Sequence, residues 1–245
     1  MESPLEEKVV LITGASSGIG EAIALALSDA GAKVVVGARR VEKLEGIASK
    51  AAGEVMVLPL DVTDPQSSRD AVAATVERFG RLDVLINNAG VMLSGMIEGA
   101  DMTEWTTMIN TNLLGTMYAT HAALPHLLES KGTVLQTSST SGRMSSVGGG
   151  VYSATKFGVN AFSESLRKEV TERGVRVVVI EPGFVDTELS SHITDPRMRE
   201  LAHSMKSTMR PLQALDVAAA VVYALSQPSH VSVSELLIRP TDQTT

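Results

Sequence analysis

The sequence of 245 residues contains no cysteine, only 3% aromatic residues and no long hydrophobic run. The absence of cysteine excludes disulfides, thiolate nucleophiles and cysteine-ligated metal sites, and it fits a cytoplasmic protein. Apolar runs such as residues 34–36 are far too short to cross a membrane. The first eight residues are acidic and lack the apolar segment of a secretory signal. We therefore predict a cytoplasmic protein that does not insert into a membrane.

The charged residues exclude a second group of functions. The net charge is −7, and the lysines and arginines form no long run, which disfavours non-specific binding to nucleic acid. The five histidines are scattered without the spacing of metal ligands, so we expect no metal site.

A content of 44% hydrophobic and 20% charged residues is ordinary for a globular protein. The length suits one large α/β domain, and we predict a single domain over residues 1–245.

Short apolar runs rich in β-branched residues alternate with longer helical patterns along the chain. The predicted strands cover residues 8–13, 33–36, 54–60, 82–86, 133–137, 176–180 and 235–238. The predicted helices cover residues 21–30, 41–52, 65–79, 103–130, 152–173 and 217–226, the fourth being two helices that meet near Asn112. Strands that are apolar throughout and separated by helices indicate a parallel sheet covered on both faces.

One stretch carries residues suited to proton transfer. Lys156 follows Tyr152 by four residues and therefore lies on the same face of a helix. A phenol normally loses its proton near pH 10, and a fixed positive charge beside it lowers that pKa. Ser139, thirteen residues before the tyrosine, offers a hydroxyl to hold a carbonyl oxygen. The three residues indicate carbonyl reduction or alcohol oxidation, although Tyr-x-x-x-Lys taken alone also fits an ordinary helix surface.

A glycine-rich segment links the first predicted strand to the first helix. It reads Thr-Gly-Ala-Ser-Ser-Gly-Ile-Gly over residues 13–20. Glycines at such a turn let the backbone approach a pyrophosphate, which then lies at the helix N-terminus. A flexible strand-to-helix turn is the alternative interpretation.

These motifs, with Asn-Asn-Ala-Gly at 87–90 and Pro-Gly at 182–183, resemble the short-chain dehydrogenase/reductase family in order and spacing. The resemblance extends from residue 8 to the last predicted strand. It implies an α/β fold: a single-domain, doubly wound Rossmann fold with a seven-stranded parallel sheet and helices on both faces. It also implies the catalytic set Asn112, Ser139, Tyr152 and Lys156. In that set, Asn112 would hold a water that links Lys156 to solvent.

The resemblance also assigns residues to cofactor binding. They are Gly14, Ser16, Ser17, Gly18, Ile19, Gly20, Ala38, Arg39, Arg40, Asp61, Val62, Asn88, Ala89, Gly90, Tyr152, Lys156, Pro182, Gly183, Val185 and Thr187. Gly14, Gly18 and Gly20 would line the pyrophosphate, and Asp61 would meet the adenine. Thr187 would touch the nicotinamide carboxamide, cap a helix, or do both.

The end of the second strand indicates which cofactor is used. A fold that prefers NAD places an acidic residue there to bind the ribose hydroxyl, but this chain has Ala38 followed by two arginines. A guanidinium suits the 2′-phosphate of NADP. A solvated pair of charges is the alternative. We predict NADP(H), with either arginine able to make the contact and Arg39 preferred.

The segment at about 188–211 corresponds to the family's substrate lid. It contains Met198, Met205 and Met209. Methionine adapts well to a variable apolar pocket, although a methionine stripe is equally compatible with plain core. The residues predicted to touch substrate are Ser141, Met144, Gly149 and Phe184.

The predicted function is NADPH-dependent reduction of a small aldehyde or ketone. Residues 38–44, 157–162 and 235–243 resemble the branch with NADP-dependent 3-hydroxy-acid dehydrogenases and the aldehyde reductase that makes clavulanic acid. Two alternatives are a 3-oxoacyl-carrier-protein-type reductase and a non-catalytic NADP-sensing regulator on the same fold.

The expected partners are a small-molecule substrate and further copies of the chain. Two predicted helices have apolar residues on more than one face, and such helices need cover on several sides. These residues are Leu114, Met117 and Leu124 in the first helix and Val159, Phe162 and Leu166 in the second. The resembling family pairs these helices across two-fold axes, so we predict a homotetramer, with a homodimer as the alternative.

Overall fold

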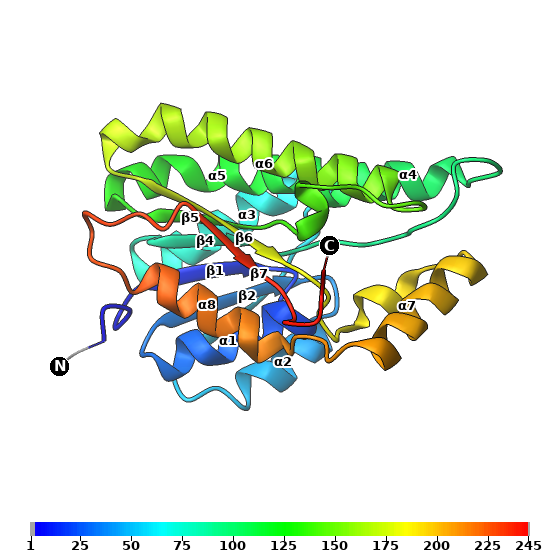
Figure 1. The fold of residues 1–245 in the computed structure, drawn as a ribbon. Coiled ribbons are helices and arrows are strands. Elements are labelled where there is room, and N and C mark those ends of the chain that lie inside the picture. Colours follow the sequence, from blue (N-terminus) through cyan, green and yellow to red (C-terminus); the bar gives the residue numbers. More distant parts are fainter. Residues whose placement is uncertain (1–2, 245) are drawn as a thin grey trace.

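The computed structural model describes residues 3–244, so residues 1, 2 and 245 of the predicted domain lie outside the described residues. In this range seven parallel strands form one sheet in the order β3-β2-β1-β4-β5-β6-β7 (Figure 1). The strands are β1 (Val9–Thr13), β2 (Lys33–Ala38), β3 (Val55–Pro59), β4 (Val84–Asn87), β5 (Thr133–Thr137), β6 (Arg176–Pro182) and β7 (Glu235–Ile238). The order reverses between β1 and β4, as in a doubly wound fold, and the predicted fold class is confirmed.

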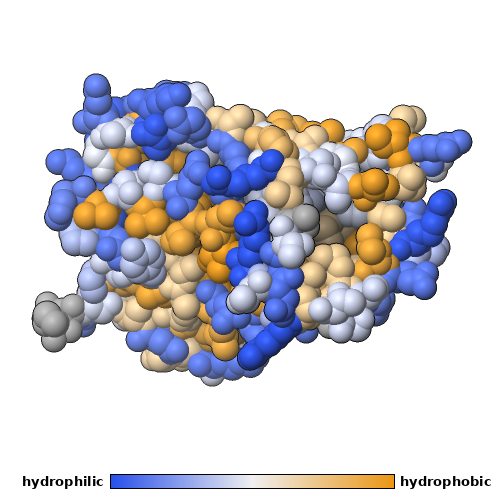
Figure 2. Space-filling view, viewed as in Figure 1, coloured by the Kyte–Doolittle hydropathy of each residue, from blue (hydrophilic) through white to orange (hydrophobic). Residues whose placement is uncertain are grey.

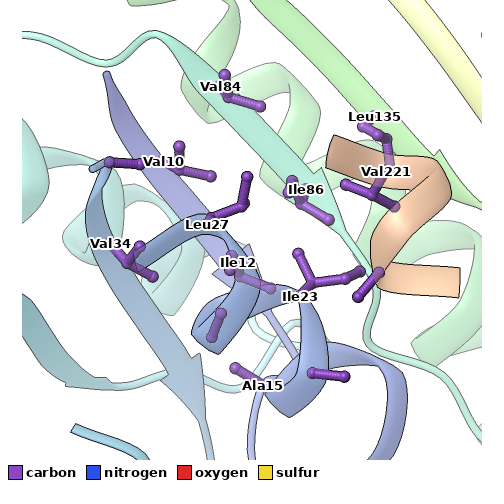
Figure 3. Close-up of a cluster of buried hydrophobic side chains, with 14 of the residues drawn as sticks. Val10, Ile12, Ala15, Ile23, Leu27, Val34, Val84, Ile86, Leu135 and Val221 are labelled. Atoms are coloured by element: carbon purple, nitrogen blue, oxygen red, sulfur yellow. The ribbon is translucent and has the colours of Figure 1, made fainter. Parts of the chain in front are cut away.

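Helices cover both faces of the sheet (Figure 1). One face carries α1 (Gly18–Asp29), α2 (Val41–Ala48) and α8 (Ala214–Leu225), and the other carries α3 (Pro65–Phe79), α5 (Gly115–Ser130) and α6 (Gly150–Val170). On the face covered by α1, α2 and α8, Ile12 of β1 packs with Ile23 and Leu27 of α1 and with Val221 of α8 (Figure 3). The inner strands are buried along their whole length because side chains on both faces meet helices.

Two strands extend two residues further than predicted toward the same edge of the sheet. β2 continues to Ala38 through its pairing with Pro59, and β6 continues to Pro182 through its pairing with Ile238. Because parallel strands end at a common edge, the loops after β1, β2, β4, β5 and β6 lie together there. This edge carries the candidate site.

The predicted break near Asn112 is confirmed and has a defined form. α4 (Met102–Met108) passes into a π-helical segment, Ile109–Leu114, which continues directly into α5. A π-helical turn inside an α-helical run changes the direction in which side chains point, and such turns occur often at functional sites. Here the turn contains Asn112, which is buried.

The region 188–211 contains a helix that the sequence analysis did not predict. A 3₁₀ turn, Glu188–His192, is followed by α7 (Pro196–Thr208), which projects from the body of the molecule (Figure 1). Asp195 caps α7 by accepting hydrogen bonds from the backbone N–H groups of Arg197 (2.8 Å) and Met198 (3.2 Å). The Asp-Pro pair at 195–196 is a helix-start signal.

No helix among residues 3–244 is both long and apolar enough to span a membrane.

Candidate active site

A cavity of about 820 Å³ opens at the carboxyl edge of the strands. Every predicted catalytic, cofactor-binding and substrate residue lines it except Gly20 and Asn112. At the right-hand end of the molecule in Figure 2, where Figure 1 places α4 and α7, several apolar residues lie among hydrophilic ones. A volume near the upper end of the range for ligand sites suits a large cofactor together with a small substrate.

Ser139 and Tyr152 bring two hydroxyl groups together. Ser139 follows β5 with an extended backbone, and its Oγ accepts a hydrogen bond from the backbone N–H of Ser141 at 3.1 Å. Tyr152 lies in the first turn of α6 and is 7% exposed. The two side chains are hydrogen-bonded to each other. A carbonyl oxygen placed between them would meet two hydroxyl donors.

Lys156 lies one helical turn beyond the tyrosine and is buried. Its Nζ donates to the backbone oxygen of Thr137 at 2.7 Å and lies 5.8 Å from the centre of the Tyr152 ring. Burial lowers the pKa of Lys156 to about 8. Burial also raises the pKa of Tyr152 to about 12, against a smaller lowering by the hydrogen bond with Ser139. The pKa shift expected from the lysine charge is therefore opposite to the one found here, where burial dominates.

Asn112 connects the loop after β4 to α6. Its Oδ1 accepts from the backbone N–H of Val91 (2.8 Å), and its Nδ2 donates to the backbone oxygen of Val91 (2.9 Å) and to Thr155 Oγ1 (3.2 Å). Thr155 Oγ1 in turn donates to the backbone oxygen of Tyr152 at 2.7 Å. Asn112 thus fixes the segment beside the catalytic pair without lining the cavity, and its water-holding role stays a prediction.

The glycine loop is shaped by its packing against the segment after β4. Gly14 has φ +66°, and a Cβ there would lie 2.5 Å from Ala89 Cα. A Cβ on Gly20 would lie 2.5 Å from Asn88 Nδ2, which itself donates to the backbone oxygen of Gly14 at 3.1 Å. Gly20 lies behind the loop rather than in the cavity, so close packing accounts for a glycine at this position.

The two arginines after β2 have different surroundings. Arg40 Nη2 donates to Ser16 Oγ (3.0 Å) and Ser17 Oγ (2.9 Å), whereas Arg39 is exposed. Burial acts to raise the pKa of Asp61, but hydrogen bonds from Thr63 and the charge of Arg39 leave that pKa below its usual value. Both guanidinium groups line the cavity, and Arg40 is the one that fixed contacts hold against the glycine loop.

The substrate end of the cavity is lined by residues from several separate segments. The four residues predicted to touch substrate line it: Ser141, Met144, Gly149 and Phe184. The segment 188–211 adds Leu189, Ser190, His192, Ile193, Met198, Leu201, Ala202 and Met205. Met209 does not line it. The residues not anticipated include Met92, Ser94, Val147 and Gln243. Gln243 Oε1 accepts from the backbone N–H of Phe184 at 2.9 Å, a contact across 59 residues that no local pattern signals.

Thr187 performs one of the two roles considered for it. Its side chain accepts a hydrogen bond from the backbone N–H of Leu189 at 3.3 Å and so caps the 3₁₀ turn, and it also lines the cavity. Contact with a nicotinamide stays a prediction.

In the described part of the chain no group of three or more His, Asp and Glu side chains is placed to hold a metal ion.

The donor set fits a nicotinamide dinucleotide. A glycine loop lies before α1, two guanidinium groups follow β2, and the hydroxyl pair and ammonium line the same cavity. The helix N-terminus and arginines suit phosphate groups, and the hydroxyl pair suits a carbonyl oxygen.

Residues 8–198 match the family described as short chain dehydrogenase. The chain is also 41% identical over 238 residues to an uncharacterized oxidoreductase of Staphylococcus aureus strain MW2, covering 96% of this chain and 98% of the relative. The chain therefore belongs to the short-chain dehydrogenase/reductase family, and its relatives support an oxidoreductase.

Solved structures agree with this assignment. An alcohol dehydrogenase from the archaeon Thermococcus sibiricus, complexed with 5-hydroxy-NADP, aligns with a TM-score of 0.88 and 34% identity, covering 98% of this chain and 99% of that one. The closed form of a serine dehydrogenase complexed with NADP⁺ aligns with a TM-score of 0.89 and 33% identity, covering 97% and 96%. The shared fold and the family membership support binding of a nicotinamide cofactor.

Proposed function

We propose that the protein is an NADP(H)-dependent oxidoreductase that interconverts a small aldehyde or ketone with the corresponding alcohol. The observation that carries this proposal is the hydrogen-bonded pair Ser139 and Tyr152, with Lys156 buried one turn away on the same cavity. The glycine loop that lines the same cavity supports the cofactor, and the two solved relatives bind NADP or its derivative.

The side chains divide the chemistry between them. Bound NADPH supplies a hydride to the carbonyl carbon. The hydroxyl of Ser139 holds the carbonyl oxygen while Tyr152 transfers its proton to that oxygen, which completes the alcohol. A pKa near 12 keeps Tyr152 protonated and ready to donate at neutral pH. The charge of Lys156 offsets the phenolate that remains, and Asn112 keeps the adjoining loop in place.

The remaining residues hold the cofactor and enclose the substrate. Gly14, Ser16, Ser17 and Gly18 would hold the pyrophosphate, Asp61 and Val62 the adenine, and Arg39 or Arg40 the 2′-phosphate. Ile19, Pro182, Gly183, Val185 and Thr187 would border the nicotinamide. We propose one domain in which residues 188–211 act as a lid, since the 3₁₀ turn and α7 form one wall of the cavity.

Consumption of NADPH and of NADH with a panel of free aldehydes and ketones tests the proposal. We expect turnover of several small carbonyl compounds with a clear preference for NADPH. Turnover confined to carrier-linked 3-oxoacyl thioesters would favour the carrier-protein reductase instead. Tight binding of NADPH without consumption under any condition would favour the non-catalytic sensor.

A further inference from the structure

Glu188, the first residue of the proposed lid, is bound to two cations, Arg40 and Lys43, that come from the start of α2. Its Oε2 accepts from Arg40 Nη1 at 3.1 Å, and its Oε1 accepts from Lys43 Nζ at 3.0 Å. It also accepts a hydrogen bond from the hydroxyl of Ser17. These contacts join the 3₁₀ turn of the lid to α2 and to the glycine loop.

The donors around Glu188 make up an anion-binding site. Ser17 is the N-cap residue of α1, and the N-terminus of a helix attracts negative charge. Arg40 adds a guanidinium that is also bonded to Ser16, and Lys43 adds an ammonium from the first turn of α2. The carboxylate of Glu188 occupies this site and lines the cavity, although Arg40 is one of the two arginines proposed to bind the cofactor's 2′-phosphate.

We propose that Glu188 competes with the 2′-phosphate of NADP(H) for Arg40 and Lys43, so that Glu188 and Lys43 both set the affinity for the phosphorylated cofactor. The inference rests on the proposed use of NADP(H). A 2′-phosphate that binds Arg40 and Lys43 displaces the negatively charged carboxylate of Glu188. The ion pairs that join the 3₁₀ turn at Glu188 to α2 are then broken. A cofactor with a free 2′-hydroxyl leaves the ion pairs intact, and its affinity does not depend on Glu188.

Binding of 2′,5′-ADP and of 5′-AMP, measured by titration calorimetry, separates the 2′-phosphate from the rest of the nucleotide. Glu188→Gln should bind 2′,5′-ADP about two- to tenfold more tightly and 5′-AMP with unchanged affinity, the range expected when partly exposed ion pairs are removed. The gain should shrink as salt rises, because salt screens exposed charges. Lys43→Gln should instead weaken 2′,5′-ADP alone, about two- to fivefold.

The matched control is Glu200→Gln, which makes the same charge change at an exposed position of α7 and should change neither affinity. An unchanged or weakened affinity of Glu188→Gln for 2′,5′-ADP would overturn the inference. An equal gain for both nucleotides would also overturn it, since Glu188 would then act on the 5′-phosphate. A wild-type protein that binds the two nucleotides equally contradicts the NADP assignment itself, while the comparison of variants still decides the role of Glu188.

Discussion

The hydroxyl groups of Ser139 and Tyr152 are hydrogen-bonded to each other, although the two residues come from different elements. Ser139 follows β5, where its extended backbone and the N–H of Ser141 fix the direction of its side chain. Tyr152 is fixed by burial in the first turn of α6. A pair of hydroxyls positioned by the protein in advance stabilises the charge that develops on a carbonyl oxygen, because little reorganisation is needed during the reaction.

Ser139→Ala should lower kcat/KM for carbonyl reduction about 10²- to 10³-fold, the usual cost of removing one donor to a developing oxyanion. Affinity for NADPH should stay the same, because the serine is assigned to the substrate oxygen. Ser145→Ala, an exposed serine on the same cavity, is the control and should retain activity. A Ser139→Ala enzyme with wild-type kcat/KM would remove the serine from the mechanism.

The pH profile of reduction should show one descending limb, near pH 8. Burial lowers the pKa of Lys156 to about 8, so the ammonium is charged below that pH and neutral above it. Burial raises the pKa of Tyr152 to about 12, so the phenol keeps its proton throughout. Since reduction uses both the tyrosine proton and the lysine charge, kcat/KM should fall as pH rises through about 8. A profile that is flat across this range would contradict the role of Lys156.

Asn112→Ala should destabilise the protein. The change removes three hydrogen bonds and leaves the backbone N–H and oxygen of Val91 without their present partner. Losses of this kind cost about 1–3 kcal/mol, and each kcal/mol lowers the Tm of a protein this size by about 2–4 °C. Calorimetry should detect the drop, whereas Asn110→Ala, on the same π-helical segment, should melt like the wild type. An unchanged Tm for Asn112→Ala would show that the loop is held by other contacts.

Assembly stays a prediction, but the structure changes which residues support it. Val159 and Leu166 are buried within the single chain, so they need no partner chain, whereas Phe162 and Leu124 are partly buried against the core. Phe157, 46% exposed on α6, is the large apolar residue left uncovered there. We expect a homotetramer by light scattering at micromolar concentration, and smaller species for Phe157→Glu. A fully active monomer of 25.8 kDa would contradict the prediction.

The sheet could be predicted from the sequence because buried parallel strands are apolar along their whole length, as in residues 9–13. The break at Asn112 was also predicted, although its π-helical form was not. α7 lacks a regular apolar pattern because its residues are mostly polar, and its one local signal is the Asp-Pro pair at 195–196 where the helix begins.

The candidate catalytic residues were accessible from sequence because their spacing is local or belongs to a family pattern. The contact between Gln243 and Phe184 was not, since it joins segments 59 residues apart. The pKa of Tyr152 was expected to fall because a cation four residues away can be inferred from spacing. The burial that raises this pKa depends on tertiary packing, and spacing alone does not report it.

Tyr152→Phe tests the proposed mechanism most directly, because it removes the proton donor and leaves the ring in its buried place. NADPH affinity and product formation are measured on the same purified sample, next to Tyr223→Phe, an exposed tyrosine of α8 that serves as the control. We predict near-normal NADPH affinity and a fall in alcohol formation of about 10²- to 10⁴-fold, the usual contribution of a general acid. A Tyr152→Phe enzyme that keeps more than a few per cent of wild-type turnover would show that Tyr152 is not the acid.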